Sequence, residues 1–196
     1  MKPLHFHVKR VTKEENATLD HSKLLGTLVA PEDFFEKNDI NDNDYFVGQL
    51  NLSEIKDPNG LLPTKGFLYF FLDIEDLTPK VIYEERDPSM MVDDINEGFD
   101  KGFCGDTHAL YIEFDNETDS QYLLGDIDES LDLQAFTDVD GYVVLMQLDA
   151  LELPQQDTVL QFATLAKYDG YYIFMIKEND LRKHDFSKVK FVDYGS

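Results

Sequence analysis

One apolar run decides the fold of this chain, Phe67-Leu68-Tyr69-Phe70-Phe71-Leu72. Aromatic and aliphatic side chains in such a short run suit the pleated surface of a sheet better than a helix interior, so the run predicts a strand. The strand is entered from Gly66 and left at Asp73. Beyond the turn at Leu77-Thr78-Pro79, the run Lys80-Val81-Ile82-Tyr83 is the expected antiparallel neighbour. An antiparallel strand pair is therefore the first predicted element.

The remaining apolar runs predict a mainly β fold with a few short helices. The aromatic content is 13% without any Trp, and most Phe and Tyr residues lie in short β-rich runs. The other expected strands are residues 45–50, 108–114, 142–148, 159–166, 171–176 and 190–192. Short helices are expected at residues 31–37, where Pro31 suits a first-turn position, and at residues 130–136 and 178–182.

The two halves of the chain carry similar stretches of sequence. Gly48-Gln49-Leu50-Asn51-Leu52 matches Met146-Gln147-Leu148-Asp149-Ala150 at an offset of 98 residues, and residues 66–77 match residues 170–181 at an offset of 104. So long a period indicates a half-chain duplication rather than a solenoid array. We therefore expect a single domain over residues 1–196, built from two similar β lobes that pack together, with approximate halves 1–100 and 101–196.

The charge balance narrows the class of partner. The 196 residues include 40 Asp and Glu against 17 Lys and Arg, which gives a net charge of −23. Such a surface repels phosphate groups, so we expect neither a nucleic acid nor an anionic membrane as partner, and a basic protein fits better. A single Cys argues against a disulfide framework, and Lys9-Arg10 precede any long apolar run, so no signal peptide is expected. These features predict a cytoplasmic protein.

Four ordered stretches carry a family resemblance. They are residues 46–55, 61–71 and 143–149, and residues 170–174 followed by the closing segment 180–189. In this order they resemble the bacterial YwqG family, a domain of unknown function. The resemblance implies a mainly β fold with an internal duplication, in a bacterial cytoplasm. The chain departs from that family where Leu124-Gly125-Asp126-Ile127 replaces a Leu-Gly-Tyr-Pro stretch, and the family's Trp-Pro and Gly-Gly elements near the N-terminus are missing.

Acidic residues concentrate in the middle of the chain. From Glu113 to Asp140 there are ten acids and no Lys or Arg, whereas bases gather before Glu14 and near the other end. We expect this stretch to form an acidic face that steers and holds a basic partner. The alternative is a solvated acidic surface that only keeps the protein soluble. The expected contact residues are Glu113, Asp115, Glu117, Asp119, Asp126, Asp128, Glu129 and Asp132, with Glu84, Glu85, Asp93 and Asp94 as further candidates.

The motifs that resemble metal sites are incomplete. Residues 39–44 start like an EF-hand calcium loop, but Asp44 stands where the sharp turn needs glycine. Residues 115–119 have the alternation of acids, but Ser120 takes the glycine position. His5 and His7 would share one face of a strand, without a third ligand nearby. We therefore expect no metal and no cofactor.

Signs of catalysis are sparse. Cys104 and His108 lie in a glycine-containing loop and could form a thiolate pair, but a free Cys is usually buried and inert, and acidic neighbours raise the pKa of a thiol. The sequence contains no Gly-rich phosphate loop and no nucleophile elbow. It favours a non-enzymatic acidic binding protein that covers a basic partner, as an immunity or inhibitor protein does. The alternative is a small-molecule-binding protein or enzyme, with its site in the cleft between the two lobes.

Overall fold

The computed structural model describes residues 1–11, 13–73, 75–92, 109–115, 121–135, 137–153 and 170–195. Its strands are β1 (Leu4–Val11), β2 (Lys23–Leu24), β3 (Leu28–Ala30), β4 (Asp44–Asn51), β5 (Phe67–Asp73), β6 (Pro79–Glu84), β7 (Met90–Val92), β8 (Ala109–Phe114), β9 (Tyr122–Gly125), β10 (Tyr142–Asp149), β11 (Gly170–Lys177) and β12 (Lys190–Gly195). The helical elements are α1 (Phe34–Asn38), α3 (Glu178–Leu181) and the 3-10 turns η1 (Asn16–Thr18), η2 (Leu52–Glu54), η3 (Leu133–Ala135) and η5 (Phe186–Lys188).

The expectation of a mainly β fold is confirmed. Strands lie at each predicted run within the described residues, including the β5–β6 pair, whereas the run 159–166 and His108 lie outside them. The helices expected near residues 31–37 and 178–182 correspond to α1 and α3. Within the described residues of the predicted segment 130–136, the helical element is the single 3-10 turn η3.

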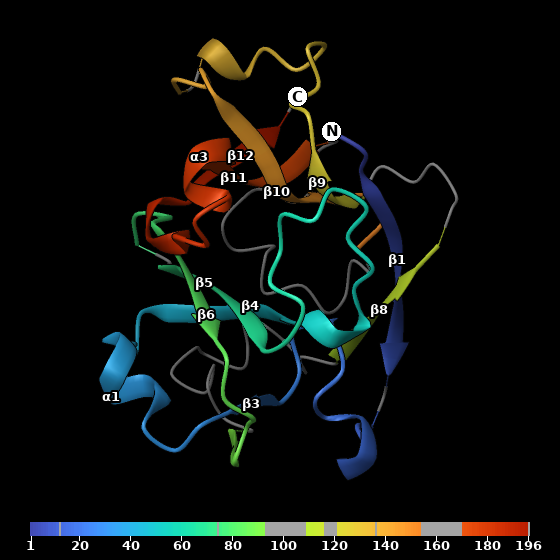
Figure 1. Ribbon diagram of the computed structural model, residues 1–196, viewed down its shortest axis with the longest axis vertical. Helices are drawn as coiled ribbons and strands as arrows, with labels where there is room; N and C mark the ends of the chain where they lie inside the picture. The colour runs from blue at the N-terminus through green and yellow to red at the C-terminus, as the bar shows by residue number, and fades with distance from the viewer. Residues whose placement is uncertain are drawn as a thin grey trace.

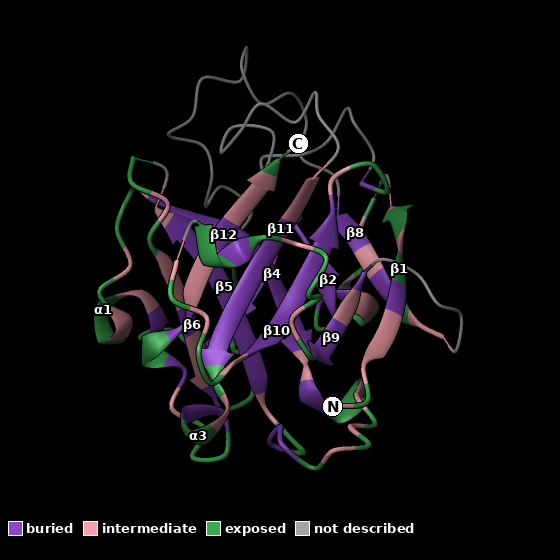
Figure 2. Cartoon of the chain, turned by 90° about the horizontal axis from the view of Figure 1, so that it is seen from above, coloured by how far each residue is buried: buried purple, intermediate pink, exposed green. Residues whose placement is uncertain are grey.

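Within the described part of the chain, ten strands form one antiparallel sheet, and β3 and β7 pair separately. The order of strands in the large sheet is β12-β11-β10-β9-β1-β8-β2-β4-β5-β6. The sheet curls so that its two ends approach each other (Figures 1 and 2). Tyr83 on β6 lies 6.4 Å from the ring of His184 and 6.3 Å from that of Phe186, in the segment that leads into β12. Side-chain contacts therefore bring the two ends together.

The main core lies on the concave face of this sheet, and the two strands richest in aromatic residues, β5 and β11, face each other across it. Leu68, Phe70 and Leu72 of β5 lie in the same buried cluster as their sequence counterparts on β11, which are Tyr172, Phe174 and Ile176. The rings of Phe70 and Phe174 meet edge to face, with centroids 5.2 Å apart. Alternate residues of the two matched stretches therefore face one core.

The hairpins β4–β5 and β10–β11 are also covered on their outer faces. Burial on both faces explains why the sequences of β5 and β11 are nearly continuous apolar runs (Figure 2). Over β5, Phe34 of α1 packs on Tyr69 and Phe71, with ring centroids 4.6 and 6.2 Å away. Over β11, Leu133 of η3 packs in a second buried cluster with Ile173 and Met175. Each hairpin is therefore buried on two sides.

The strands on the two sides of the sheet's centre follow the chain in a corresponding order. From the central pair β1–β8, one side runs through β9, β10, β11 and β12, and the other runs through β2, β4, β5 and β6. The register of β4 shifts between Phe46 and Gly48, and that of β10 shifts between Val144 and Met146. These positions are related by the same 98-residue offset as the sequence match. The two outer hairpins therefore share one local geometry.

The two central strands each pair with a strand of the opposite chain half. β1 pairs with β9, and β8 pairs with β2. The amide of Phe6 donates to the carbonyl of Gln121 (3.2 Å), and the amide of Ile112 donates to that of Ser22 (3.0 Å). The first and second halves of the chain are thus interlocked by an exchange of strands.

Candidate functional site

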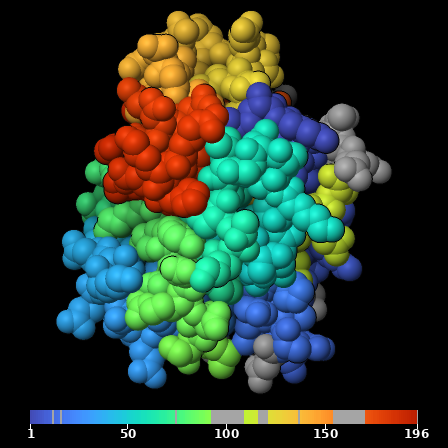
Figure 3. Space-filling view, in the orientation of Figure 1, coloured from blue at the N-terminus to red at the C-terminus, as the bar shows by residue number. Residues whose placement is uncertain are grey.

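The acidic segment, residues 126–140, connects β9 to β10 and contains six acids without any Lys or Arg. In Figure 3 it belongs to the yellow and orange residues that form the upper end of the molecule. Its acidic side chains are all exposed. They are Asp126, Asp128, Glu129, Asp132, Asp138 and Asp140.

Apolar residues hold this segment against the outer face of β10, β11 and β12. Ile127, Leu131 and Val139 pack on the buried cluster that contains Leu133 and Val144. Because these apolar residues alternate with the acids, burying one set leaves the other set outside. The acidic segment therefore presents its charges from an anchored backbone.

Local hydrogen bonds fix the turns that carry the acids. The amide of Ser130 donates to Oδ1 of Asp128 (2.8 Å), and the amide of Asp140 donates to Oδ1 of Asp138 (3.1 Å). The bonds from Ser130 lower the pKa of the Asp128 carboxyl, so this group stays ionised at neutral pH. This turn thus favours the charged form of Asp128.

Most acids of the segment have no ionic partner. Among the described residues, no ion pair involves Asp128, Glu129, Asp132, Asp138 or Asp140. Lys190 reaches the segment, but its Nζ contacts Thr137 Oγ1 (3.2 Å) and the backbone carbonyl of Asp138 (3.1 Å) instead of a carboxylate. Asp126 differs, because its Oδ2 lies 2.5 Å from the amino group of Met1.

The other predicted contact acids are placed differently. Glu113 and Asp115 belong to β8 and its end, where they flank His7: Nε2 lies 3.0 Å from Glu113 Oε2 and Nδ1 lies 2.7 Å from Asp115 Oδ2. These contacts, Asp115 first, raise the pKa of the imidazole and favour its cationic form. Both acids therefore share a hydrogen-bonded imidazole, and Glu113 also lies 3.6 Å from Lys9 Nζ. Glu117 and Asp119, like Asp93 and Asp94, lie outside the described residues.

Glu84, a further candidate contact residue, does not lie on the surface but is buried in a network of ion pairs. Its side chain is 4% exposed, and its Oε2 lies 3.0 Å from Lys37 Nζ and 2.8 Å from Arg86 Nη2. The bonds from Arg86, followed by those from Lys37, lower the pKa of the Glu84 carboxyl to about 2. Glu85 is exposed and pairs with Lys65.

This network predicts an acid-dependent loss of stability. Because the folded pKa of Glu84 is depressed, its contribution is present above the unfolded value near 4.5 and is lost as pH falls toward 2. Since its partners are half exposed, we expect about 2 kcal/mol. Urea unfolding at pH 5 and pH 2.5 should show a smaller difference for Glu84→Gln than for wild type. Glu85→Gln is the matched control, and an equal pH dependence in all three proteins would contradict this assignment.

Metal ligation has little support among the described residues, where no group of three or more His, Cys, Asp or Glu is placed to hold an ion. In the loop that resembles an EF-hand, Lys80 Nζ lies 2.8 Å from the Asp39 carbonyl and 2.7 Å from Asp44 Oδ2. A lysine ammonium therefore already pairs with the Asp44 carboxylate of this loop. Both ring nitrogens of His7 face carboxylates on opposite sides, and Cys104 and His108 lie outside the described residues.

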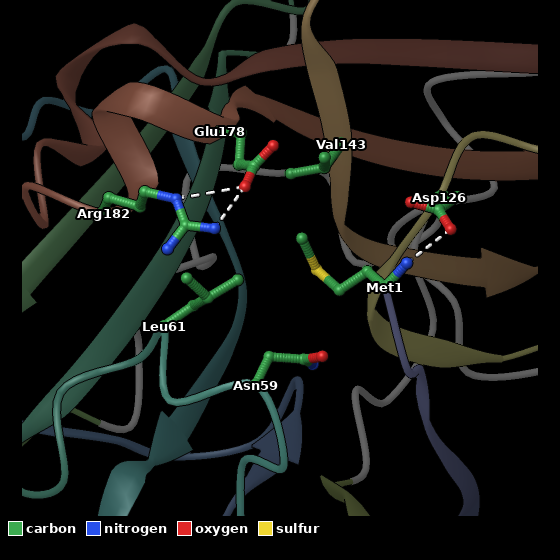
Figure 4. Close-up of a pocket in the computed structure, with 7 residues that line it drawn as sticks. All are labelled: Met1, Asn59, Leu61, Asp126, Val143, Glu178 and Arg182. Carbon is green, nitrogen blue, oxygen red and sulfur yellow. Dashed lines mark hydrogen bonds and ion pairs between the residues drawn. The ribbon is translucent and has the colours of Figure 1, made fainter.

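A cavity of about 250 Å³ opens between parts of both halves (Figure 4). The first half contributes Met1 and the loop that follows η2, and the second contributes β9's end, β10 and α3. The lining residues are Met1, Asn59, Leu61, Asp126, Val143, Glu178 and Arg182.

Sequence reasoning singled out Asp126 for another reason and did not assign a site to the rest of this lining. The sequence signal that could have pointed to this lining is Arg182, because it lies in the closing segment that carries the family resemblance. Asn59 and Leu61 lie more than a hundred residues from Arg182 in the sequence, so only the tertiary fold brings them together.

Comparison with known proteins adds a family without an activity. A family model described as "Domain of unknown function (DUF1963)" matches residues 22–192. No curated protein matches the chain. Among the described residues, no helix is long and apolar enough to cross a membrane.

Proposed function

Because this chain belongs to the DUF1963 family, whose function is unknown, its role has to be inferred from its own surface, and we propose that it is an acidic binding protein that covers a basic partner. The observation that carries this proposal is the row of exposed carboxylates on the anchored acidic segment, of which only Asp126 forms an ion pair in the described part of the chain. Asp128, Glu129 and Asp132 are its central contacts. Partner binding of this kind is the electrostatic strategy of immunity and inhibitor proteins.

The physical advantage of the arrangement is fast and selective encounter. An acidic surface attracts a basic protein before short-range contacts form, and it repels acidic competitors. Because the segment is anchored by Leu133 and its neighbours, little backbone ordering has to accompany binding. Glu113 and Asp115 have His7 beside them, so they contribute less to the attraction than the unpaired acids do.

We further propose that the protein is a YwqG-like member of the family, a single cytoplasmic domain over residues 1–196 that arose by internal duplication. Three correspondences support the duplication: the mirrored strand order, the matching register shifts in β4 and β10, and the exchanged strands β1 and β8. A fourth is that Leu25 and Leu124, each followed by glycine, both adopt left-handed backbone conformations, with φ of 57° and 54°.

The test reverses three charges within the acidic segment, Asp128→Lys, Glu129→Lys and Asp132→Lys, and captures proteins from the native host at two salt concentrations. We expect the wild type to retain a basic protein whose association rate falls about tenfold or more in the triple variant at low salt, because steering acts on the encounter. Folding should change little, since these side chains are exposed and only the hydrogen bond from Ser130 to Asp128 is lost.

A matched control carries the same charge change elsewhere. Glu36, Asp42 and Glu75 are exposed and form no ion pair within the described residues, so their reversal to Lys gives the same net charge. The control variant should retain the partner. Equal loss in both variants would reduce the effect to net charge, and capture of no basic protein by the wild type would contradict the proposed function.

A further inference from the structure

The central strand pair of the sheet, β1–β8, holds a histidine between two carboxylates (strands in Figure 1). We propose that His7 is a pH-dependent switch, which bridges Glu113 and Asp115 while its ring is protonated and releases Glu113 when the ring loses a proton. This proposal goes beyond the proposed function and does not rest on it, because it concerns the contact between the two halves and not the acidic segment.

The two contacts of His7 can be made together only by the protonated ring. Nδ1 lies 2.7 Å from Asp115 Oδ2, and Nε2 lies 3.0 Å from Glu113 Oε2. A neutral imidazole has one N–H and one lone pair, and an ionised carboxylate only accepts hydrogen bonds. One contact of a neutral ring would therefore set a lone pair against a carboxylate oxygen. The imidazolium donates from both nitrogens, so the arrangement fits the cation.

The titratable groups around His7 come from three strands. Within the described residues they are His5 and Lys9 on β1, Tyr111, Glu113 and Asp115 on β8 and its end, and Tyr122 on β9. The carboxylates act most strongly among them, Asp115 first, and they raise the pKa of His7 above its ordinary value of 6.5 although desolvation opposes this shift. The ring therefore changes its charge close to neutral pH.

Glu113 is the carboxylate that the neutral ring releases. Its contact with His7 is the longer one, and its side chain is 49% exposed against 23% for Asp115. Its other oxygen, Oε1, lies 3.6 Å from Lys9 Nζ, so a second cation is close by. Asp115 is also held at its backbone, where its amide donates to the carbonyl of His5 (3.2 Å). The neutral ring therefore keeps its proton on Nδ1, toward Asp115, and turns the lone pair of Nε2 toward Glu113.

The switch acts where the two halves of the chain exchange strands. His7 lies opposite Glu113 in the register of β1 and β8, and these strands belong to different halves. Loss of the proton removes one cross-strand hydrogen bond and takes the charge out of the other. Because the folded pKa is raised, the stabilisation is complete below the ordinary pKa of 6.5 and is lost as pH rises through the folded value. The end of the β1–β8 pair therefore loosens as pH rises.

An NMR titration of the full chain, with ¹⁵N in the histidine rings, tests the protonation of His7. At pH 6.5 we expect both ring nitrogens to carry a proton in most molecules, and at pH 9 we expect the proton on Nδ1 alone. Asp115→Asn should lower the pKa of His7 more than Glu113→Gln does, because the Asp115 contact is the stronger one. Asp42→Asn is the matched control: it removes an exposed acid that forms no ion pair within the described part of the chain, and it should leave this pKa unchanged.

Amide hydrogen exchange measures the effect of the switch on the strands. After correction for the intrinsic exchange rate, the protection of the Asp115 amide should fall about threefold between pH 6 and pH 8.5 in wild type and not in His7→Gln. The Ile112 amide, which donates to the carbonyl of Ser22 (3.0 Å), should keep its protection in both proteins. A neutral His7 at pH 6.5, a proton on Nε2 instead of Nδ1 at pH 9, or protection of the Asp115 amide that does not depend on His7 would overturn the proposal.

Discussion

The variant Phe174→Ala is expected to lose about 3–5 kcal/mol of unfolding free energy. Phe174 is fully buried at 0% exposure, with its ring centroid 5.2 Å from that of Phe70 and 5.0 Å from that of Phe191. Truncation removes a large apolar surface and leaves a cavity that β5 and β11 cannot fill, because both strands are held on their outer faces too. Urea unfolding monitored by circular dichroism measures the loss.

The same experiment on Phe70→Ala and on the double variant measures the coupling across the core. Since the rings meet edge to face, we expect a coupling of about 0.5–1.5 kcal/mol. Leu151→Ala is the control, because Leu151 is 57% exposed and its truncation should change stability by less than about 0.5 kcal/mol. An unchanged unfolding midpoint in Phe70→Ala and Phe174→Ala would contradict the assignment of both rings to the core.

Lys23→Ala is expected to be comparably destabilising, at about 3–5 kcal/mol, for an electrostatic reason. Lys23 on β2 is fully buried, and its Nζ pairs with Glu14 Oε1 and donates to the carbonyl of Leu19 (2.9 Å). Burial lowers the pKa of the ammonium, and the contact with Glu14 opposes this shift. Removal of the lysine leaves the Glu14 carboxylate, which is only 10% exposed, without its counterion.

A double variant distinguishes this cause from lost packing. Glu14→Gln together with Lys23→Met removes both charges and keeps most of the volume, so thermal and urea unfolding should show recovery of more than half of the loss. Lys9→Ala is the control, because Lys9 is 67% exposed and its Nζ lies 3.6 Å from Glu113. If the double variant is as unstable as Lys23→Ala, the uncompensated charge is not the cause.

The strands that could be predicted from sequence are those with strong local signals. Residues 67–72 and 171–176 are dense in aromatic and branched side chains, and turns bound them. An extended strand was expected only at His5 and His7, although the alternation of Leu4, Phe6 and Val8 with polar residues predicts the longer strand β1. In the segment 130–136, where a helical segment was predicted, the described residues form the 3-10 turn η3, whose Leu133 packs against β10 and β11.

The two halves of the sequence share a further short repeat. Lys23-Leu24-Leu25-Gly26 and Tyr122-Leu123-Leu124-Gly125 are similar, and they form β2 and β9 with the turns that follow. Such strands are too short to show a period of two, so only comparison of the halves reveals them. The contact between His7 and Glu113 could not be predicted either, because the two residues are 106 positions apart and no local sequence pattern links them.

The candidate site likewise has some features that the sequence predicts and others that only the fold determines. The density of acids at residues 126–140 is a property of the linear sequence, and it pointed to the acidic segment. Which acids are neutralised is a property of the fold, which pairs Asp126 with Met1 and buries Glu84 between Lys37 and Arg86. The cavity around Arg182 requires loops and strands from both halves, so its position could be expected only in general terms, as a cleft between lobes.

The exchange of strands between the two halves affects how the nascent chain folds. On the ribosome, β1 emerges long before its neighbours β8 and β9 have been translated, because its partners lie about a hundred residues or more downstream. Until then its edge amides and carbonyls can bond only to water or to a foreign strand. Topologies dominated by such distant pairings fold slowly, and exposed edges invite aggregation meanwhile. The charged residues along β1, among them Lys9 and Arg10, discourage such unwanted pairing of the waiting strand.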